Sequence, residues 1–318
     1  MSSLPFTILT PTFNRADVIV RAFDSLCAQT GPRFEWVVVD DGSTDDTAQV
    51  LAACAARAPF ELRYVRQPNG HKKVAFNRGV REARGQLLVV LDDDDELAPA
   101  ALARLWAIWQ SIDPSAREHY IGVTGLCQRA DGRVVGDRFP ADLMDCTATR
   151  MFFEHGVRGE KFGCQRVDVL RRYAYPEHIE GFVPESLLWW QIASDGFLTR
   201  FVNEVLRRYH STTVSLSTSP APSGRHAPGL YLLSWSWIEL QLGFWRHAPW
   251  AFAMMAARLT RYRLAMRQTR AGAVVARDYP LRRPMGRLLV GLMMPVGYAL
   301  YARDRWQDAR RGRGAQCR

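Results

Sequence analysis

Blocks of apolar and polar residues alternate along the first third of the chain. Short apolar runs predict strands near residues 6–10, 35–39, 62–66 and 87–91. The amphipathic segments between them predict helices near residues 16–28, 45–57, 73–84 and 98–110. Further along, we expect strands at 119–126 and 133–139 and a helix at 184–195. Strands that alternate with helices in this way indicate an α/β sheet.

The fourth predicted strand ends in a dense acidic run. Its last apolar residues are followed directly by Asp92, Asp93, Asp94, Asp95 and Glu96. Like charges this close repel one another, so a bound cation is a natural partner for them. Mg²⁺ and Mn²⁺ prefer oxygen ligands and usually share them with substrate phosphates. The run therefore predicts a site for a metal and a diphosphate. A solvated acidic turn is the alternative interpretation of such a charge run.

Two earlier strands bring further polar groups to the same edge of the predicted sheet. The strand near 35–39 ends in Asp40 and Asp41, before a Gly-Ser-Thr turn that leads into a helix. The strand near 6–10 opens into a segment with an aromatic ring and an amide, Pro11–Arg15. Open α/β sheets bind ligands outside the carboxyl ends of their strands. We therefore expect the three segments to form one ligand site.

These motifs, in this order and at this spacing, resemble family 2 glycosyltransferases of the GT-A fold. The matching segments are Thr10–Arg15, Val39–Asp45, Asn69–Gly70, Ala75–Gly79, Ala83–Gly85 and Leu91–Asp95. The resemblance covers about residues 5–215. It implies a Rossmann-like nucleotide-diphospho-sugar transferase domain of the α/β class, with a mixed sheet flanked by helices.

The resemblance also implies which residues bind the nucleotide-sugar donor. Phe13 matches the aromatic residue that stacks on the base, and Asp41 matches the carboxylate that hydrogen-bonds a uracil ring. Asp94 matches the metal-binding member of the Asp-x-Asp motif, with Mn²⁺ or Mg²⁺ as the cofactor. Asp92 and Asp93 fall beside it, facing donor ribose, sugar or metal. The remaining donor-binding candidates are Pro11, Thr12, Asn14, Lys72, Lys73 and Asn77.

One position departs from the family pattern. Members often carry an arginine just before the asparagine that matches Asn77, and this chain has Phe76 there. The diphosphate is then short of one cation, which Lys72 or Lys73 would replace. A solvated start of a helix is the alternative interpretation for the two lysines.

A second carboxylate candidate follows in the acceptor half. The segment Phe182–Ala193 is similar to the Glu-Asp-x-x-Leu-Trp helix of the family, with Glu185 in register with the catalytic aspartate. Glutamate keeps the carboxylate that a general base needs and lengthens it by one methylene. Together with Arg200–His210, this helix resembles a bacterial exopolysaccharide and capsule branch of the family. Without the resemblance, Glu185 would be an acidic residue favoured by a helix N-terminus.

Length and charge divide the chain. The 318 residues suggest about two domains, and 47% apolar residues suffice for a sizeable core. Residues 221–318 hold 17 arginines, no lysine and 4 acidic residues, a net charge of +13, whereas residues 1–220 have a net charge of −3. We therefore expect a catalytic domain over 1–220 and a basic helical region over 221–318. The stretch 211–228 is rich in Ser, Thr, Pro and Gly and predicts a linker or a mobile loop.

The basic region is also rich in aromatic residues. Trp and Phe cluster between residues 235 and 252, arginines follow, and a 15-residue apolar run fills 288–302. A membrane span needs about 20 residues, so we expect this run to be too short to cross a bilayer. Helices that combine aromatic residues with arginine suit an anionic membrane surface. The alternative is a helical cap on the catalytic domain or a contact in an oligomer.

The cysteines and the N-terminus bear on the compartment. The six cysteines include no Cys-x-x-Cys pair and no histidine at metal-ligand spacing, which predicts reduced thiols in a cytosolic protein. The N-terminus runs directly into the first strand, so we expect no signal peptide. We therefore expect a cytoplasmic enzyme, held peripherally at the inner face of the cell membrane.

The predicted function is inverting, metal-dependent transfer of a sugar from a nucleotide-diphosphate donor, UDP-linked, to a glycan hydroxyl. The resemblance implies a lipid-linked saccharide acceptor in cell-surface polysaccharide synthesis. A sugar-phosphate nucleotidyltransferase would also use a metal at a strand end, but residues 11–17 lack its Gly-rich, basic signature. A nucleic-acid-binding protein would use the arginine-rich region, but it would have no use for the motifs at residues 10–95. We therefore expect no nucleic-acid partner.

Overall fold

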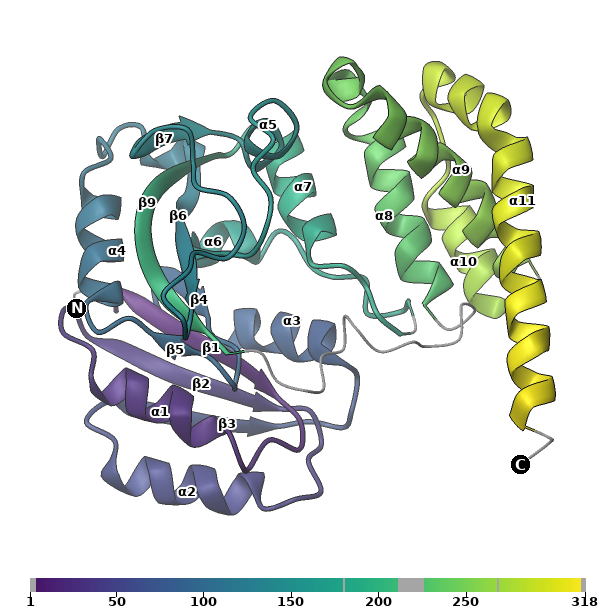
Figure 1. Cartoon of the computed structure of the whole chain (residues 1–318). Helices are drawn as coiled ribbons and strands as arrows, with labels where there is room; N and C mark the ends of the chain where they lie inside the picture. Colours follow the sequence, from purple (N-terminus) through teal and green to yellow (C-terminus); the bar gives the residue numbers. More distant parts are fainter. Residues whose placement is uncertain (1–3, 180, 211–225, 268, 316–318) are drawn as a thin grey trace. The chain divides into compact units, whose positions relative to one another are not determined.

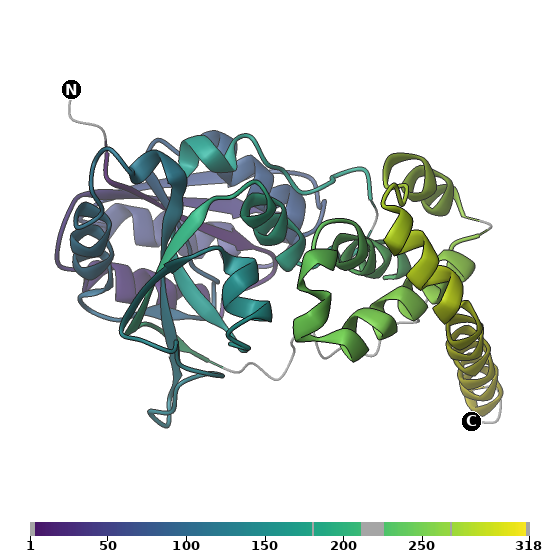
Figure 2. The ribbon, with the colours of Figure 1, turned by 90° about the horizontal axis from the view of Figure 1, so that it is seen from above.

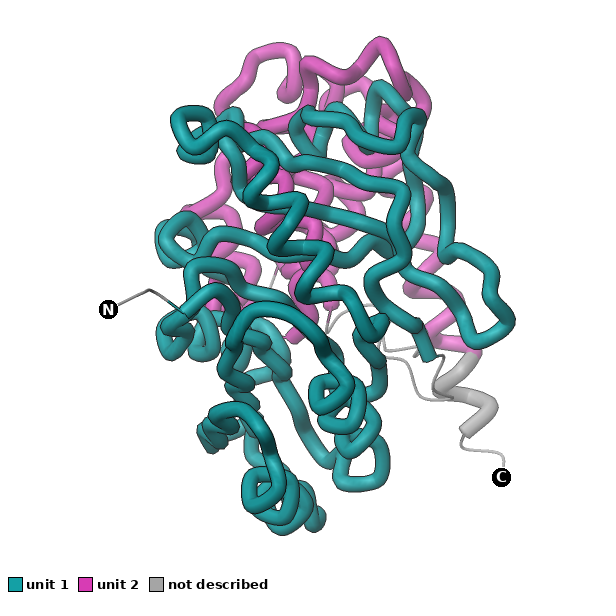
Figure 3. Tube along the Cα trace, turned by 90° about the vertical axis from the view of Figure 1, so that its left-hand side faces the viewer, with its two compact units in different colours: residues 1–175, 195–215 teal, residues 176–194, 216–318 magenta. Residues whose placement is uncertain are grey.

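The structure, a computed structural model, describes residues 4–179, 181–210, 226–267 and 269–315, with side chains to residue 310. The predicted linker at 211–228 lies almost wholly outside these residues. The chain forms two compact units, the first made of residues 1–175 and 195–215 and the second of residues 176–194 and 216–318 (Figure 3).

The first unit contains the strands and helices of an α/β domain. Its first half consists of β1 (Phe6–Thr12), α1 (Ile19–Cys27), β2 (Phe34–Asp40), α2 (Thr47–Arg57), β3 (Glu61–Arg66), α3 (Lys72–Glu82), β4 (Leu87–Val90), β5 (Glu96–Leu97) and α4 (Ala101–Gln110). Its second half consists of η1 (Arg117–His119), β6 (Tyr120–Arg129), β7 (Leu143–Cys146), α5 (Ala148–Phe153), β8 (Lys161–Arg166), α6 (Val167–Leu170) and β9 (Leu198–Tyr209).

The strands form one mixed sheet. In the described residues it has nine strands in the order β3-β2-β1-β4-β8-β6-β9-β5, and β7 pairs with β9 (Figure 1). Strands β3, β2, β1 and β4 are parallel, β8 is antiparallel to β4 and β6, and β9 is parallel to β6. The sheet twists along its length, as Figures 1 and 2 show. The parallel half therefore gathers the ends of β1, β2 and β4 at one edge.

The two faces of the parallel half bury alternate residues. Phe6, Ile8 and Trp36 are fully buried and belong to a core shared with α1, α2 and α4. Leu9 points to the other face, where α3 packs on β1. A Cβ at Gly79 would come within 2.1 Å of the Leu9 side chain, so glycine permits this close approach of helix and strand. Burial of each large apolar side chain stabilises the fold by about 1.5–3 kcal/mol.

Most of the predicted elements are confirmed. The first four strands and helices, the strand at 119–126 and the helix at 184–195 all lie within three residues of their predicted ends. The strand predicted at 133–139 is wrong, because only Val134 makes an isolated bridge, to Gln128. Gly132 and Gly136 have positive φ angles of 84° and 72°, which turn the backbone instead of extending it. The predicted α/β class with a mixed sheet and flanking helices is confirmed.

The second unit is helical. It consists of α7 (Ser186–Ser194), α8 (Ala227–Glu239), η2 (Leu242–His247), α9 (Pro249–Ala265), α10 (Arg270–Asp278) and α11 (Pro284–Ala315). Helix α7, which we assigned to the catalytic domain, packs on α8: the Trp190 and Trp237 rings lie 5.6 Å apart, and Gln241 Nε2 donates to Ser194 Oγ at 2.6 Å. Residues 176–194 therefore share a core with the C-terminal helices.

Helix α11 is longer than the apolar run that predicts it. Residues Pro284–Arg310 form a helical segment of 27 residues that contains an 18-residue window with a mean hydropathy of 1.3, which is long and apolar enough to cross a membrane by length and composition alone. This corrects the expectation from residues 288–302 alone, because the helix continues beyond the apolar run at both ends. It is the one helix of the described residues with these properties.

Candidate active site

Backbone hydrogen bonds align the ends of three parallel strands. The Asp41 amide donates to the Thr12 carbonyl at 2.9 Å, and the Leu91 amide donates to the Leu9 carbonyl at 3.0 Å. In register, Leu9 pairs with Val90, and Thr12 pairs with Asp40. The segments that follow β1, β2 and β4 therefore leave the sheet side by side, at the edge where α/β folds bind ligands.

The acidic run forms a tight turn that is surrounded by cations. Thr12 Oγ1 donates to Asp93 Oδ2 at 2.8 Å, and Arg15 lies 3.6 Å from a carboxylate oxygen of both Asp93 and Asp94. Lys72 Nζ lies 2.8 Å from Asp92 Oδ1. The Arg21 guanidinium, from α1, donates to the Asp94 carbonyl at 2.9 Å and so stabilises the backbone of the turn.

The carboxylates of this turn differ in their pKa values. Burial raises the pKa of Asp93 to about 7, against the hydrogen bond from Thr12 and the charge of Arg15, which lower it. Burial likewise raises the pKa of Asp95 to about 7, against the charge of Arg207. For Asp92, burial is outweighed by Lys72 and Arg207, which hold its pKa below the usual value. Asp92 therefore ionises more readily than Asp93 and Asp95.

The predicted base-binding residues follow the ends of β1 and β2. Asp41 is buried, and its Oδ1 accepts hydrogen bonds from Gln67 Nε2 at 2.8 Å and from the Gly70 amide at 2.9 Å. Its Oδ2 receives no hydrogen bond from the described residues and is free to accept one from a ligand. Phe13, 45% exposed, follows β1 and offers a ring to solvent.

Asn14 fixes the shape of this part of the site. It adopts a left-handed φ of 53°, and its Oδ1 accepts a hydrogen bond of 2.7 Å from the Thr44 amide. Its own amide donates to Ser43 Oγ at 2.9 Å. Asn14 therefore joins the segment after β1 to the segment after β2. Its hydrogen bonds thereby fix the positions of the two segments that carry Phe13 and Asp41. Pro11 lies buried within β1.

The three predicted donor-binding residues of helix α3 lie in different surroundings. Lys72 reaches the acidic turn, and its side chain is 41% exposed. Lys73 is buried on the same first turn. Asn77 is buried, and its amide donates to the Tyr175 carbonyl at 2.9 Å and accepts from the Tyr175 amide at 3.0 Å. Asn77 thus anchors the segment around Tyr175, against which the buried ring of Phe76 also packs at 5.1 Å.

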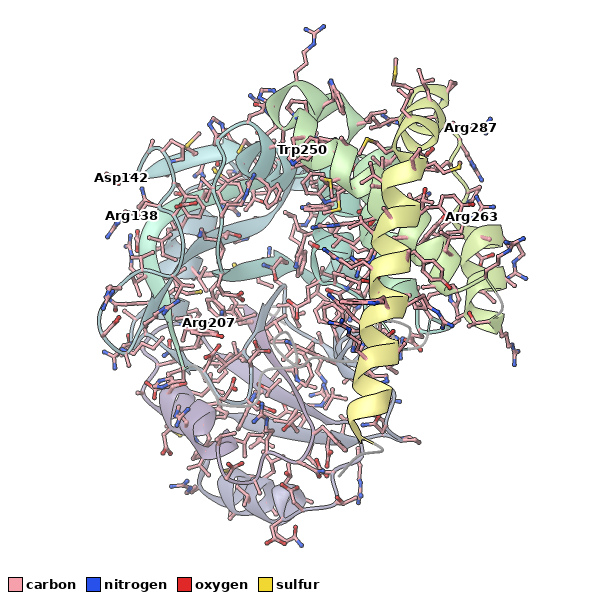
Figure 4. The ribbon with its side chains drawn as sticks, turned by 45° about the vertical axis from the view of Figure 1, so that its right-hand side comes forward. Arg138, Asp142, Arg207, Trp250, Arg263 and Arg287 are labelled. Carbon is pink, nitrogen blue, oxygen red and sulfur yellow. The ribbon has the colours of Figure 1, made fainter. Side chains whose placement is uncertain are left out.

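Arg207 is a site residue that sequence reasoning missed. It projects from β9 and is 3% exposed (Figure 4). Its Nη1 lies 3.2 Å from Asp95 Oδ2 and 3.8 Å from Asp92 Oδ2, while Nη2 donates to Glu160 Oε1 at 2.9 Å. Burial lowers its pKa, but the nearby Cys127 and carboxylates outweigh this, and the net shift is upward. The segment that contains it was recognised, but nothing in its sequence marks Arg207, because Leu206 and Arg207 are both buried and the pattern of β9 does not alternate.

Glu185 lies directly before α7, in the second unit. Its side chain is exposed, and its carbonyl accepts a hydrogen bond of 3.1 Å from the Leu188 amide in the first turn of the helix. This is the position where a carboxylate is favoured by the helix dipole. The Pro184-Glu185 pair therefore lies directly before the helix, which begins two residues after its predicted start.

The donor set suits a loosely held divalent cation. In the described residues, no three His, Cys, Asp or Glu side chains form a ready-made metal cage. Mg²⁺ and Mn²⁺ usually need only one or two carboxylates and complete their shell with water and substrate phosphates. Asp95 Oδ2 and His210 Nε2 are buried with no hydrogen bond among the described residues, although an ion-pair partner lies near each. A carboxylate-rich turn with unsatisfied buried atoms fits such an ion.

Comparison with known proteins agrees with this arrangement. Residues 7–157 match the model of the glycosyl transferase family 2. The chain is 32% identical over 230 residues to the uncharacterized glycosyltransferase YibD of Escherichia coli, covering 67% of this chain and 64% of YibD. It is 27% identical over 222 residues to the GalNAc(5)-diNAcBac-PP-undecaprenol beta-1,3-glucosyltransferase of Campylobacter jejuni, covering 67% and 68%. The match spans only 37% of another relative, an uncharacterized glycosyltransferase of Nostoc sp..

Solved structures share the fold. S. aureus TarS 1-349 in complex with UDP-GlcNAc has a TM-score of 0.58 at 17% identity, covering 92% of this chain and 80% of TarS 1-349. The mannosyltransferase PcManGT from Pyrobaculum calidifontis, in complex with GDP-Man and Mn2+, has a TM-score of 0.54 at 22% identity, covering 95% and 87%. Motifs, sheet order, family match and relatives converge on one assignment: the chain belongs to the family 2 glycosyltransferases and has the GT-A fold.

Proposed function

We propose that the protein is an inverting, metal-dependent glycosyltransferase that takes its sugar from a UDP-linked donor. One observation carries this proposal: the acidic turn, Lys72 and Asp41 stand at one sheet edge, with Phe13 exposed beside them. Such a set offers a surface for a base, a hydrogen-bond acceptor and groups for a metal and a diphosphate. Family membership and the nucleotide-sugar complexes of the two structural neighbours support it.

Asp41 supports uracil as the base. A carboxylate accepts hydrogen bonds and cannot donate them when ionised, so it favours a ring N–H such as that of uracil. The hydrogen bonds from Gln67 and Gly70 hold Oδ1 and so orient Oδ2 toward a ligand. The exposed ring of Phe13 gives the base an apolar face to stack on.

The acidic turn and its cations have separate roles in the proposed reaction. A bound Mn²⁺ or Mg²⁺ would supply charge neutralisation to the departing diphosphate. Asp94, with Asp92 or Asp93, would hold that ion. Lys72 balances Asp92 in the described geometry, and its half-exposed ammonium can reach a diphosphate oxygen instead. Positively charged groups aimed at the leaving group stabilise charge as it develops there.

Glu185 is our candidate for the general base. The reaction needs a general base in addition to the metal-binding carboxylates, and Glu185 would accept the proton of the attacking hydroxyl. Its side chain is exposed directly before α7. The proposal includes a direct, in-line attack of the acceptor oxygen on the anomeric carbon, which inverts that centre.

We further propose a lipid-linked saccharide as the acceptor, in the synthesis of a cell-surface polysaccharide at the cytoplasmic face of the membrane. Two findings support this. The name of the Campylobacter jejuni relative describes transfer to an undecaprenol-linked saccharide. The C-terminal part of this chain is strongly basic, with a net charge of +13 on residues 221–318, which suits an anionic membrane surface.

A donor screen tests the proposed activity. Thermal unfolding is measured with UDP-, GDP- and dTDP-sugars, each with and without Mn²⁺. A ligand at 100 times its Kd stabilises the folded state by about 2.7 kcal/mol, which is a readily measured shift. We expect a UDP-sugar with Mn²⁺ to give the largest shift and to release UDP slowly. Exchange of pyrophosphate into the nucleotide sugar would instead indicate a nucleotidyltransferase, and no shift with any donor would refute the proposal.

A further inference from the structure

Helix α11 exposes an apolar face that its own unit does not cover. Among the described residues, large apolar side chains that are more than a third exposed concentrate on this helix: Met285, Leu288, Leu292, Met294, Val296, Tyr298 and Trp306. Leu292 is 68% exposed and Leu288 is 57% exposed. A water-soluble domain rarely leaves such a contiguous apolar surface bare. We therefore expect a partner to cover this face.

The opposite side of α11 is packed on α9. A Cβ at Gly297 would lie 2.6 Å from the Ala257 carbonyl oxygen, so glycine allows the two helices to touch. One turn further, Arg261 Nε and Asp304 Oδ2 form an ion pair at 2.5 Å. Residue numbers rise together along both helices, so α9 and α11 run parallel. At 3.6 residues per turn, Leu288, Leu292 and Trp306 fall on the side of α11 turned away from this seam.

Arginines stand at both ends of the apolar face, with a tryptophan at its C-terminal end. Arg282, Arg283 and Arg287 are exposed where α11 begins. At the other end, the Arg310 guanidinium carbon lies 3.7 Å from the Trp306 ring centroid. Aromatic residues and arginine are the side chains that prefer the lipid headgroup layer.

We propose that this face of α11, with Leu288, Leu292 and Trp306 and the arginines at both of its ends, lies flat in the headgroup layer of an anionic bilayer. The charge pattern selects phospholipid over a second copy of the chain, because two such faces would bring like charges together at both ends. The proposal deepens the location given above under the proposed function. It does not depend on the sugar donor.

The seam argues against a crossing helix. If α11 crossed the bilayer as a lone span, Ala257 would lie level with the middle of the helix. The exposed Arg258 beside it would then enter hydrocarbon, where a charge is costly. In the flat orientation α9 and its arginines stay on the water side.

Flotation with lipid vesicles tests this inference on the full-length protein. We expect the wild type to float with vesicles of phosphatidylglycerol and phosphatidylcholine, and weakly with phosphatidylcholine alone. Leu292→Lys should lower the partition coefficient by about tenfold or more, because an apolar side chain no longer enters the lipid. Leu143→Lys, at a 51% exposed leucine of the first unit, is the matched control and should float like the wild type. Leu288→Lys repeats the test at a second exposed position.

Alkaline carbonate separates the two orientations. We expect carbonate to release the bound wild type, as it releases surface-bound proteins. Resistance to carbonate would mean that α11 crosses the bilayer. If the wild type fails to float, or if Leu292→Lys and Leu288→Lys float as it does, the proposal is wrong. A dimer that becomes monomeric with Leu292→Lys, without lipid binding, would assign the face to a second copy. None of these results bears on donor turnover.

Discussion

Replacing Arg207 by methionine should destabilise the first unit strongly. The guanidinium is buried between the carboxylates of Asp92, Asp95 and Glu160, and methionine keeps much of its volume without its charge. Removing one partner of a buried ion pair costs about 3–5 kcal/mol, and here the 1% exposed carboxylate of Asp95 would stay buried without its partner, whereas Asp92 and Glu160 are 32% and 47% exposed. For a unit of this size, each kcal/mol lowers Tm by about 2–4 °C. We therefore expect Tm to fall by about 6 to 20 °C.

The loss in Tm caused by Arg207→Met should depend on pH. The pKa of Asp95 is raised to about 7, so its ionisation opposes folding, and stability is lost as the pH rises through 7. Without Arg207 the carboxyl would hold its proton to still higher pH. The loss in Tm should therefore be larger at pH 8 than at pH 6.

Differential scanning calorimetry of the metal-free protein with a chelator measures the effect. The control is Arg208→Met, because the neighbouring Arg208 is 56% exposed and its nearest carboxylate oxygen, on Glu96, is 4.0 Å away. An exposed pair of this kind contributes at most about 1 kcal/mol. If Arg207→Met lowers Tm no more than Arg208→Met does, the ionic network does not stabilise the site, and the reasoning fails.

Three further predictions concern the site. Glu185→Gln should lower turnover by about 10² or more with UDP affinity nearly unchanged, and an equal loss of affinity in calorimetric titration would show that it is not the base. Asp41→Asn should weaken UDP by about tenfold or more but weaken CDP less, because an amide can donate to cytosine N3; equal losses would place Asp41 away from the base. Metal ligands must be deprotonated, and the pKa of both Asp93 and Asp95 is raised to about 7, so Mn²⁺ affinity should fall from pH 8 to pH 6; a constant affinity would contradict this.

Local patterns predicted the parallel half of the sheet well because each of its elements is encoded locally. β1, β2 and β4 are apolar runs with buried residues on both faces, and the helices between them carry an apolar stripe. The Asp92–Asp95 run stands out for the same reason: it follows a strand without interruption. The convergence of Thr12, Asp41 and Asp94 then follows from the shared edge of parallel strands.

Strand β9 shows where local patterns fail. Its sequence, Leu198–Tyr209, mixes apolar residues with Arg200, Asn203 and Glu204, so it does not resemble a core strand. Arg207 is nevertheless buried, because its charge is matched by Asp95 and Glu160 from distant parts of the chain. Only the folded arrangement shows that match.

The helical unit shows a second limit. Helix α7 is apolar on most sides, and its partner α8 lies beyond residues 195–226, so nothing in the segment itself indicates what it packs against. In α11, charged residues after Ala302 end the apolar run but not the helix, since arginine is a good helix former. A hydropathy pattern therefore underestimates the length of this helix.

The most direct test of the proposed activity is release of UDP from a UDP-sugar, measured with Mn²⁺ and with a chelator, for the wild type and Asp94→Asn. An amide in place of the carboxylate removes a hard anionic ligand from a turn on the sheet edge, and thermal unfolding checks that the fold is kept. We predict that the wild type releases UDP only with Mn²⁺, and that Asp94→Asn loses this activity at saturating Mn²⁺. Near wild-type turnover by the variant, or turnover that persists in chelator, would contradict a metal-dependent transfer at this site.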